Sequence, residues 1–460
     1  MYFKQITTPG LGCFSYVIGC PAAREMVVVD PKRDVQDYLD ISREEGMKIT
    51  HVIDTHVHAD HVSGTHELKS LTGCDIMVYE TSPVSYDFTP LKEGQKLVVG
   101  NAGLEVLHTP GHTPDALSLL VTDFTRGDEP WMILTGDVLF VGDIGRPDLV
   151  GDAKLDEQID NLYNTLYIKF QKYPDSLEVF PAHGAGSLCG RGMSSKPSST
   201  LGFERRHNPM LGFDSYESFH LAMSQNFPAR PKSFTHIIST NAGGAPLLER
   251  CPLDRAMEPA RFEERMLDGA AVIDVRDAAA FAGYHIPGSI NIGFEPSLAN
   301  WVGMVVDPKA DLLLVVESKE DYDRMCIELH RIGYDNIFGY LTGGIQSWVY
   351  SGRPVEKLSI DSAQDLQNCQ AENKPVSLID VRTPGETAGG VIPGAVKFPL
   401  ADILDGKFDL SEDDHHILYC ASGYRSNIAA SYLQRHGFWN VRALAGGFLA
   451  WSRAGYEVEK

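Results

Sequence analysis

The segment Thr55-His56-Val57-His58-Ala59-Asp60-His61 gathers histidine and aspartate just after the apolar, strand-like run His51 to Asp54. His56 and His58 are two positions apart, so in an extended segment their side chains face the same way. We expect Asp60 and His61 to open the helix that follows. Imidazole and carboxylate groups are ligands of transition metals. The segment therefore predicts a metal site at the end of a strand.

Three further ligand-type residues also follow strand-like runs. His112 comes after Leu104 to Leu107, Asp137 after Trp131 to Leu134, and His183 after Leu177 to Phe180. Loops at strand ends are where a rigid sheet can position reactive groups. Together with the first segment, these residues supply enough ligands for one or two metal ions.

This pattern resembles the metallo-β-lactamase superfamily over residues 1–240. The resemblance implies an αββα sandwich with its metals at one edge. The H-x-H-x-D-H signature is specific for the fold but not for the reaction, because hydrolases, nucleases and oxygenases share it.

An internal repeat organises the rest of the chain. Ala271-Val272-Ile273-Asp274-Val275-Arg276 recurs as Ser377-Leu378-Ile379-Asp380-Val381-Arg382, and each copy continues to Ile-Pro-Gly and then to Gly-Gly with a nearby Trp. Repeats of about one hundred residues match the size of a small domain. Short apolar runs alternate with helical patterns, which predicts parallel α/β sheets. We expect domains at 259–356 and 357–460, after a linker at 241–258.

The last copy contains the loop Cys420-Ala421-Ser422-Gly423-Tyr424-Arg425-Ser426 between an apolar strand and a helical pattern. A cysteine at a helix N-terminus beside an arginine is stabilised as a thiolate. Backbone N–H groups of such a loop can hold an anionic persulfide. The copy resembles the rhodanese family through C-x-x-G-x-R-S, which implies Cys420 as the sulfur-carrying nucleophile and Arg425 as its electrostatic partner.

The middle copy departs from this pattern. A gapless alignment places Val316 opposite Cys420 and Asp321 opposite Arg425, so the nucleophile is missing and the charge is reversed. We interpret residues 259–356 as an inactive rhodanese domain that serves as a spacer or an assembly surface.

The order of the three domains resembles the persulfide dioxygenase–rhodanese fusions of bacterial sulfide detoxification, over nearly the whole chain. Gly145-Arg146-Pro147-Asp148-Leu149 matches that family as well. The resemblance implies one Fe(II) ion held by His56, His112 and Asp137, with positions open for substrate and O2. His58, Asp60, His61 and His183 would then support these ligands from behind.

The same resemblance implies a reaction. A low-molecular-weight persulfide, such as glutathione persulfide, would react with O2 to give sulfite. Cys420 would pass sulfane sulfur to sulfite and yield thiosulfate, or thiosulfate would load Cys420 in the opposite direction.

Two alternatives stay open at this point. Every residue needed for a second metal is present, so a dizinc hydrolase of the glyoxalase II type, acting on a glutathione thioester with Asp137 between the metals, is the main rival. Zinc is therefore the rival cofactor to iron. The other alternative is a sulfur carrier that docks partner proteins through the middle domain.

Two residues near the predicted metal site have competing interpretations. Arg146 either holds a substrate carboxylate and orders the site wall, or forms a structural ion pair with Asp143 or Asp148. Cys189 follows His183 by six positions, so it either lines the pocket as a substrate-binding thiol or is inert.

Composition limits the partners and the compartment. The net charge of −22, from 62 acidic and 40 basic residues, argues against nucleic acid and anionic membranes, since both need a basic face. No apolar run is long enough to span a membrane and no signal peptide is recognisable, so we expect a cytoplasmic protein. The eight cysteines form no C-x-x-C pair and are expected to be free thiols. The sequence leaves the oligomeric state open, a homo-oligomer included.

Overall fold

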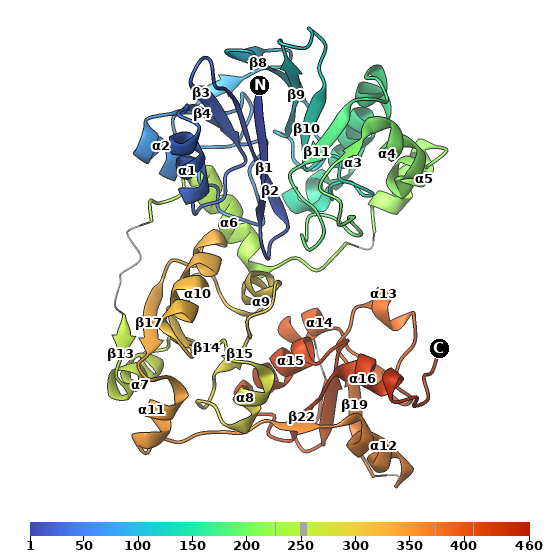
Figure 1. Ribbon diagram of the computed structural model, residues 1–460. Coiled ribbons are helices and arrows are strands. Elements are labelled where there is room, and N and C mark those ends of the chain that lie inside the picture. The colour runs from blue at the N-terminus through green and yellow to red at the C-terminus, as the bar shows by residue number, and fades with distance from the viewer. Residues whose placement is uncertain (226, 249–254, 373, 408) are drawn as a thin grey trace. The chain divides into compact units, whose positions relative to one another are not determined.

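The computed structural model describes residues 1–225, 227–248, 255–372, 374–407 and 409–460 (Figure 1). The chain divides into two compact units, Met1–Arg250 with Ile327–Gly333, and Cys251–Cys326 with Tyr334–Lys460. Within the described ranges, no helix is long and apolar enough to cross a membrane.

The first unit contains two six-stranded sheets, and each sheet is built from one continuous stretch of chain. The first sheet has the order β1-β2-β3-β4-β5-β6, with bounds β1 Tyr2–Thr8, β2 Cys13–Cys20, β3 Glu25–Val29, β4 Lys48–Ile53, β5 Asp75–Tyr79 and β6 Thr89–Leu91. The second has the order β12-β11-β10-β9-β8-β7, with bounds β7 Lys96–Val99, β8 Ala102–His108, β9 Leu117–Asp123, β10 Met132–Gly136, β11 Glu178–Pro181 and β12 Ser199–Thr200.

Alternation of side chains along the strands produces the layers. On β3, Val27 and Val29 join the core between the two sheets, whereas Met26 and Val28 join the core under the outer helices. Successive side chains of a strand point to opposite faces, so a wholly apolar strand needs cover on both sides. The helices of this unit are α1 Gln36–Glu44, α2 Thr65–Thr72, α3 Leu155–Tyr163, α4 Leu201–His207, α5 Tyr216–Met223 and α6 Lys232–Gly243. The expected αββα sandwich is confirmed.

The second unit contains two five-stranded sheets of the same topology. The first has the order β13-β17-β16-β14-β15, with bounds β13 Ala256–Met257, β14 Ala271–Asp274, β15 Ile290–Asn291, β16 Leu312–Val315 and β17 Ile337–Leu341. The second has the order β18-β22-β21-β19-β20, with bounds β18 Ser359–Asp361, β19 Ser377–Asp380, β20 Val396–Lys397, β21 His416–Tyr419 and β22 Val441–Leu444. All the strand pairs of both sheets are parallel, as the sequence repeat predicts.

Short helices connect the strands of each sheet. In the middle domain they are α7 Pro259–Leu267, α8 Ala278–Gly283, α9 Leu298–Val305, α10 Lys319–Arg331 and α11 Gly344–Tyr350. In the last domain they are α12 Ala363–Ala371, α13 Pro384–Thr387, α14 Leu400–Leu404, α15 Tyr424–Arg435 and α16 Gly447–Arg453. The repeated aspartate-arginine motif is a buried ion pair in both domains, with 2.6 Å between Arg Nη2 and Asp Oδ2 in each. It fixes the chain after the central strand, because a paired guanidinium fork has a defined orientation.

The segment predicted as a linker begins inside α6. Asn241 is a buried residue of that helix, and its side-chain amide donates to the carbonyl oxygens of His58 and His61, both at 2.9 Å. The end of α6 therefore anchors the histidine-rich loop of the first domain. Residues 249–254 of the predicted linker, Cys251 among them, lie outside the described residues.

Candidate active sites

Three side chains converge where strands of the two sheets of the first unit end. The Nε2 atoms of His56 and His112 lie 3.8 and 3.4 Å from Oδ2 of Asp137. All three side chains are buried, and none of these three atoms has a hydrogen-bond partner among the described residues. A buried polar atom without a partner is destabilising, so three such atoms that face one another indicate that a bound group belongs between them. The other polar atom of each side chain has a partner, so the three unpaired atoms face one another.

Contacts behind the ring nitrogens fix these orientations. Nδ1 of His112 donates to the backbone carbonyl of Arg146 at 2.8 Å, and Nδ1 of His56 lies 3.0 Å from the hydroxyl of Thr55. Such contacts select the tautomer that leaves Nε2 free for a metal. Gly145 permits this packing, because a Cβ there would stand 1.8 Å from the carbonyl oxygen of Asp137.

Of the residues expected to support the ligands, Asp60, His61 and His183 bond to one another. Nε2 of His58 instead lies 3.1 Å from Oδ1 of Asp30, and its buried Nδ1 has no partner among the described residues. His183 is bonded on both ring nitrogens, to Asp137 at 2.5 Å and to Asp60 at 2.7 Å. Asp60 and His61 lie in a loop, since α2 begins only at Thr65. The expectation that they open a helix was wrong, because their side chains and Asn241 hold the loop instead.

Charge and burial set the protonation of this network. Burial raises the pKa of Asp137, but the nearby imidazoles of His183, His56 and His112 outweigh it and hold the pKa below its usual range. Burial lowers the pKa of His183, and the carboxylates of Asp137 and Asp60 reverse that shift and raise it. Burial, together with the neighbouring His58, keeps the pKa of His56 low. A neutral His56 beside an ionised Asp137 is the state in which both bind a cation.

The donor set fits a mononuclear iron site. Two histidines and one carboxylate on one face are the ligand pattern of non-haem Fe(II) oxygenases, with positions left open for substrate and O2. The three unpaired atoms of His56, His112 and Asp137 match that set in number and kind.

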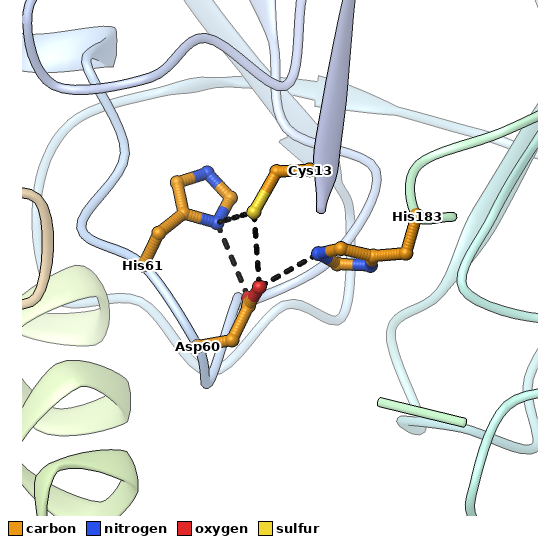
Figure 2. A group of neighbouring side chains, drawn as sticks. All are labelled: Cys13, Asp60, His61 and His183. Carbon is orange, nitrogen blue, oxygen red and sulfur yellow. Dashed lines mark hydrogen bonds and ion pairs between the residues drawn. The ribbon is translucent and has the colours of Figure 1, made fainter. Parts of the chain in front are cut away.

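Sequence reasoning missed Cys13, the first residue of β2. Its buried thiol lies 3.2 Å from Oδ2 of Asp60 and 3.8 Å from Nδ1 of His61, as Figure 2 shows. Nothing in the local sequence pairs Cys13 with this loop. The signal is tertiary, a backbone bridge between Cys13 and His183.

The structure places Arg146 and Cys189 beside the site with distinct contacts. The Arg146 guanidinium is buried and donates to both carboxylate oxygens of Asp148, at 2.7 and 2.6 Å, and to the carbonyl of Pro228. These contacts favour the structural ion pair with Asp148. Cys189 is buried near Asp137 and His183, and burial raises the pKa of its thiol, which is therefore protonated at neutral pH.

The sulfurtransferase-type segment follows β21 and runs into α15, whose first three residues are Tyr424, Arg425 and Ser426. The thiol of Cys420 is buried and accepts from the backbone N–H of Gly423 at 3.1 Å, and the hydroxyl of Ser426 lies 3.8 Å away. Gly423 has a φ of 108°, which a side chain would disfavour. Arg425 donates to both carboxylate oxygens of Glu386, at 2.7 and 2.6 Å. This pairing, above all the hydrogen bonds from Arg425, lowers the pKa of Glu386 to about 2.

A cavity of about 610 Å³ adjoins this loop, and Ser422, Gly423 and Tyr424 form part of its wall. The middle domain supplies the facing wall, including Glu295, Glu317 and Asp321. The Tyr424 hydroxyl donates to the carbonyl of Gly293 at 2.9 Å. The loop that follows Cys420 and the middle domain therefore line the same cavity.

The strand register of the middle domain reproduces the gapless alignment. Asp274 pairs with Val315 as Asp380 pairs with Tyr419, so the next residues, Val316 and Cys420, are equivalent. Asp321, at the position of Arg425, accepts a hydrogen bond from Ser318.

Comparisons with known proteins agree with this architecture. Residues 8–183 match the family model of the metallo-beta-lactamase superfamily, and residues 258–351 and 362–454 match that of the rhodanese-like domain. A mitochondrial persulfide dioxygenase of Mus musculus is 29% identical over 245 residues, which cover 52% of this chain and 86% of that protein. A sulfurtransferase of Allochromatium vinosum is 38% identical over 99 residues, covering 22% of this chain and 92% of that protein.

A crystal structure described as a metallo-beta-lactamase from Staphylococcus aureus subsp. aureus COL superposes with a TM-score of 0.68 at 31% identity. The superposition covers 74% of this chain and 98% of the chain in that crystal structure. The chain is therefore a metallo-β-lactamase superfamily protein with two rhodanese-like domains in tandem. Its first domain is similar to persulfide dioxygenases, and the domain order is consistent with a persulfide dioxygenase–rhodanese fusion.

Proposed function

We propose that this chain is a fused enzyme of sulfide detoxification. Its first domain is an iron-dependent dioxygenase that converts a low-molecular-weight persulfide, such as glutathione persulfide, into sulfite. Its last domain transfers sulfane sulfur through Cys420 to sulfite, giving thiosulfate. The observation that supports the proposal most is the convergence of three unpaired ligand atoms on His56, His112 and Asp137. The similarity to persulfide dioxygenases over the first domain and to a sulfurtransferase supports both activities.

In the first reaction, a persulfide RSSH, O2 and water yield the thiol RSH and sulfite, with two protons released. Iron at this site, when bound, supplies open coordination positions and the redox chemistry that brings O2 and sulfur together. The chain's own residues hold the charges around the reaction. His183 lies between Asp137 and Asp60, so it keeps Asp137 ionised and oriented.

In the second reaction, the Cys420 thiolate attacks the sulfane sulfur of a persulfide, forms a cysteine persulfide and releases the thiol RSH. Sulfite then attacks the outer sulfur, the S–S bond breaks, and thiosulfate leaves the restored thiolate. The N–H of Gly423 points at the sulfur and stabilises its charge, and the loop ends at the N-terminus of α15. Arg425 lines a second cavity of about 320 Å³ beside the loop, where Glu386 holds its guanidinium through two hydrogen bonds.

The rival dizinc hydrolase uses the same residues, with Asp137 between two metals. Nε2 of His58 contacts Asp30 at 3.1 Å and its buried Nδ1 has no partner among the described residues, so the metal content of the protein separates the two candidates. The cytoplasmic location and the inactivity of the middle domain stay predictions.

The test supplies iron-loaded full-length protein with glutathione persulfide, first without O2 and then with it. We expect O2 uptake and thiosulfate from the wild type, and sulfite in place of thiosulfate from Cys420→Ser. Cys74→Ser, which changes a buried thiol outside both sites, serves as the control and should resemble the wild type. Thioester cleavage by a two-zinc protein, with no persulfide-dependent O2 uptake, would favour the hydrolase.

A further inference from the structure

The cavity of about 610 Å³ beside the Cys420 loop has an acidic wall. Four carboxylates line it, all of them from the middle domain: Asp277, Glu295, Glu317 and Asp321. Among the described residues that line the cavity, the one basic side chain is Arg276, and its guanidinium is already paired with Asp274 at 2.6 Å. The cavity therefore carries an excess of negative charge.

The last domain shows what part of this wall has replaced. There Arg425 is paired with Glu386 through two hydrogen bonds. The equivalent positions of the middle domain hold Asp321 and Ala280, so both members of the ion pair have changed. Asp321 accepts a hydrogen bond from the hydroxyl of Ser318 at 2.8 Å, which leaves its negative charge in place. The loop of the middle domain therefore attracts cations, whereas its counterpart carries an arginine.

A buried side chain of the last domain requires a hydrogen-bond donor at this cavity. Asn427 on α15 is 1% exposed and lines the cavity, and its Oδ1 has no partner within the described part of the chain. Its orientation follows from Asn291, whose Nδ2 donates to the carbonyl oxygens of Asp274 and Arg276 at 2.9 and 2.8 Å. Asn291 thus presents Oδ1 to Asn427, which donates through Nδ2 and leaves its own Oδ1 unpaired. An unpaired buried acceptor indicates a ligand that carries N–H or O–H donors.

The same cavity reaches the loop that holds the reactive sulfur. Gly423 lines it, and the N–H of Gly423 donates to the Cys420 sulfur at 3.1 Å. The second cavity, which Arg425 lines, shares three lining residues with the first: Glu295, Ser422 and Tyr424. The loop therefore contributes to one acidic cavity and to one that contains a guanidinium, so the charge of a ligand decides which of the two it enters.

We propose that the acidic cavity binds the ammonium group of an aminothiol persulfide while that persulfide loads Cys420. An ammonium group supplies N–H donors and a positive charge, which match the unpaired oxygen of Asn427 and the four carboxylates. The Cys420 thiolate attacks the sulfane sulfur and the S–S bond of the donor breaks. Its electron pair leaves with the aminothiol sulfur, which takes up the persulfide proton. The inference rests on the proposed sulfur transfer and adds the class of donor that the middle domain selects.

The test measures the loading of Cys420 in the full-length protein without O2, so that the first domain does not consume the persulfide. Two donors are compared at one sulfite concentration: the persulfide of cysteamine, which carries an ammonium group, and that of N-acetylcysteamine, which is neutral. Thiosulfate is the measured product. Because the transfer has two separate steps, kcat/KM for the persulfide reports the loading step alone.

The variant Glu317→Gln/Asp321→Asn removes two of the four charges, and the new amide at position 321 can still accept from Ser318. We expect kcat/KM for the charged donor, divided by that for the neutral donor, to fall about fivefold from the wild-type value. The division removes any difference between the two thiols as leaving groups. Glu320→Gln/Asp323→Asn is the matched control, because it makes the same change of net charge at exposed positions of α10 outside the cavity lining. It should keep the wild-type ratio.

High ionic strength gives a second measurement. It should lower the ratio in the wild type and in the control, and lower it less in Glu317→Gln/Asp321→Asn, since salt screens exposed charges. A ratio that is unchanged in this variant, or that falls equally in the control, overturns the inference while sulfur transfer stands. A wild type that makes no thiosulfate from either donor overturns the proposed sulfur transfer and the inference with it.

Discussion

Arg146→Lys separates a structural role of this arginine from a role in substrate binding. The guanidinium, with 1% of the side chain exposed, donates to Asp148 twice, and to the carbonyls of Pro228 and Leu188 at 2.8 and 3.3 Å. A lysine carries its donors on one nitrogen and cannot reproduce this fork. Losing about two hydrogen bonds to charged groups, at about 1.5 kcal/mol each, destabilises the first domain by about 3 kcal/mol.

Calorimetry of the full chain measures this loss. For a domain of this size, about 3 kcal/mol lowers Tm by about 6–12 °C. The KM for persulfide and the iron content should stay unchanged, because the contact that orients His112 comes from the backbone carbonyl of Arg146. Arg126→Lys, whose side chain is 71% exposed, should leave Tm unchanged. A KM at least tenfold higher, with Tm equal to that of the wild type, would refute the structural role.

Three further substitutions test the two sites. His58→Ala should retain its iron, because the proposed ligand set of His56, His112 and Asp137 does not include this ring; metal analysis that finds iron lost would make His58 a ligand. Glu386→Gln should lower the Tm of the last domain above pH 5. That difference should shrink as pH falls from 4.5, the ordinary carboxyl pKa, towards the lowered pKa of about 2, and a pH-independent difference would contradict it. Gly447→Ala places a Cβ 2.3 Å from the carbonyl oxygen of Cys420 and should slow sulfur transfer about 100-fold with O2 uptake intact. Gly437→Ala, also at positive φ but with open space around it, is its control, and equal rates in the two variants would contradict the steric argument.

Local patterns predicted the elements of this fold because strands and ligands adjoin in sequence. The apolar runs before His56, His112, Asp137 and His183 are β4, β8, β10 and β11. The repeat likewise predicted two parallel α/β domains, and each copy retains the buried aspartate-arginine pair.

Contacts between distant segments could not be predicted in this way. Cys13 is next to His183 only because the start of β2 bridges a loop of the other sheet. Asn241 looks like a loop residue in a polar stretch, yet it holds the carbonyls of His58 and His61. That Nε2 of His58 contacts Asp30 depends on side-chain packing, which a spacing of two residues does not determine.

The continuity of each sheet has a consequence for how the protein matures. All strands of the first sheet lie within residues 2–91, and those of the second within residues 96–200. Domains fold from the N-terminus during synthesis, so the nascent chain exposes His56 and His58 before Asp137 has been translated. The proposed metal can meet its full ligand set only after Asp137, at the end of β10, has left the ribosome. A translation product that stops after β6 would retain the histidine-rich loop and still have no aspartate to complete the site.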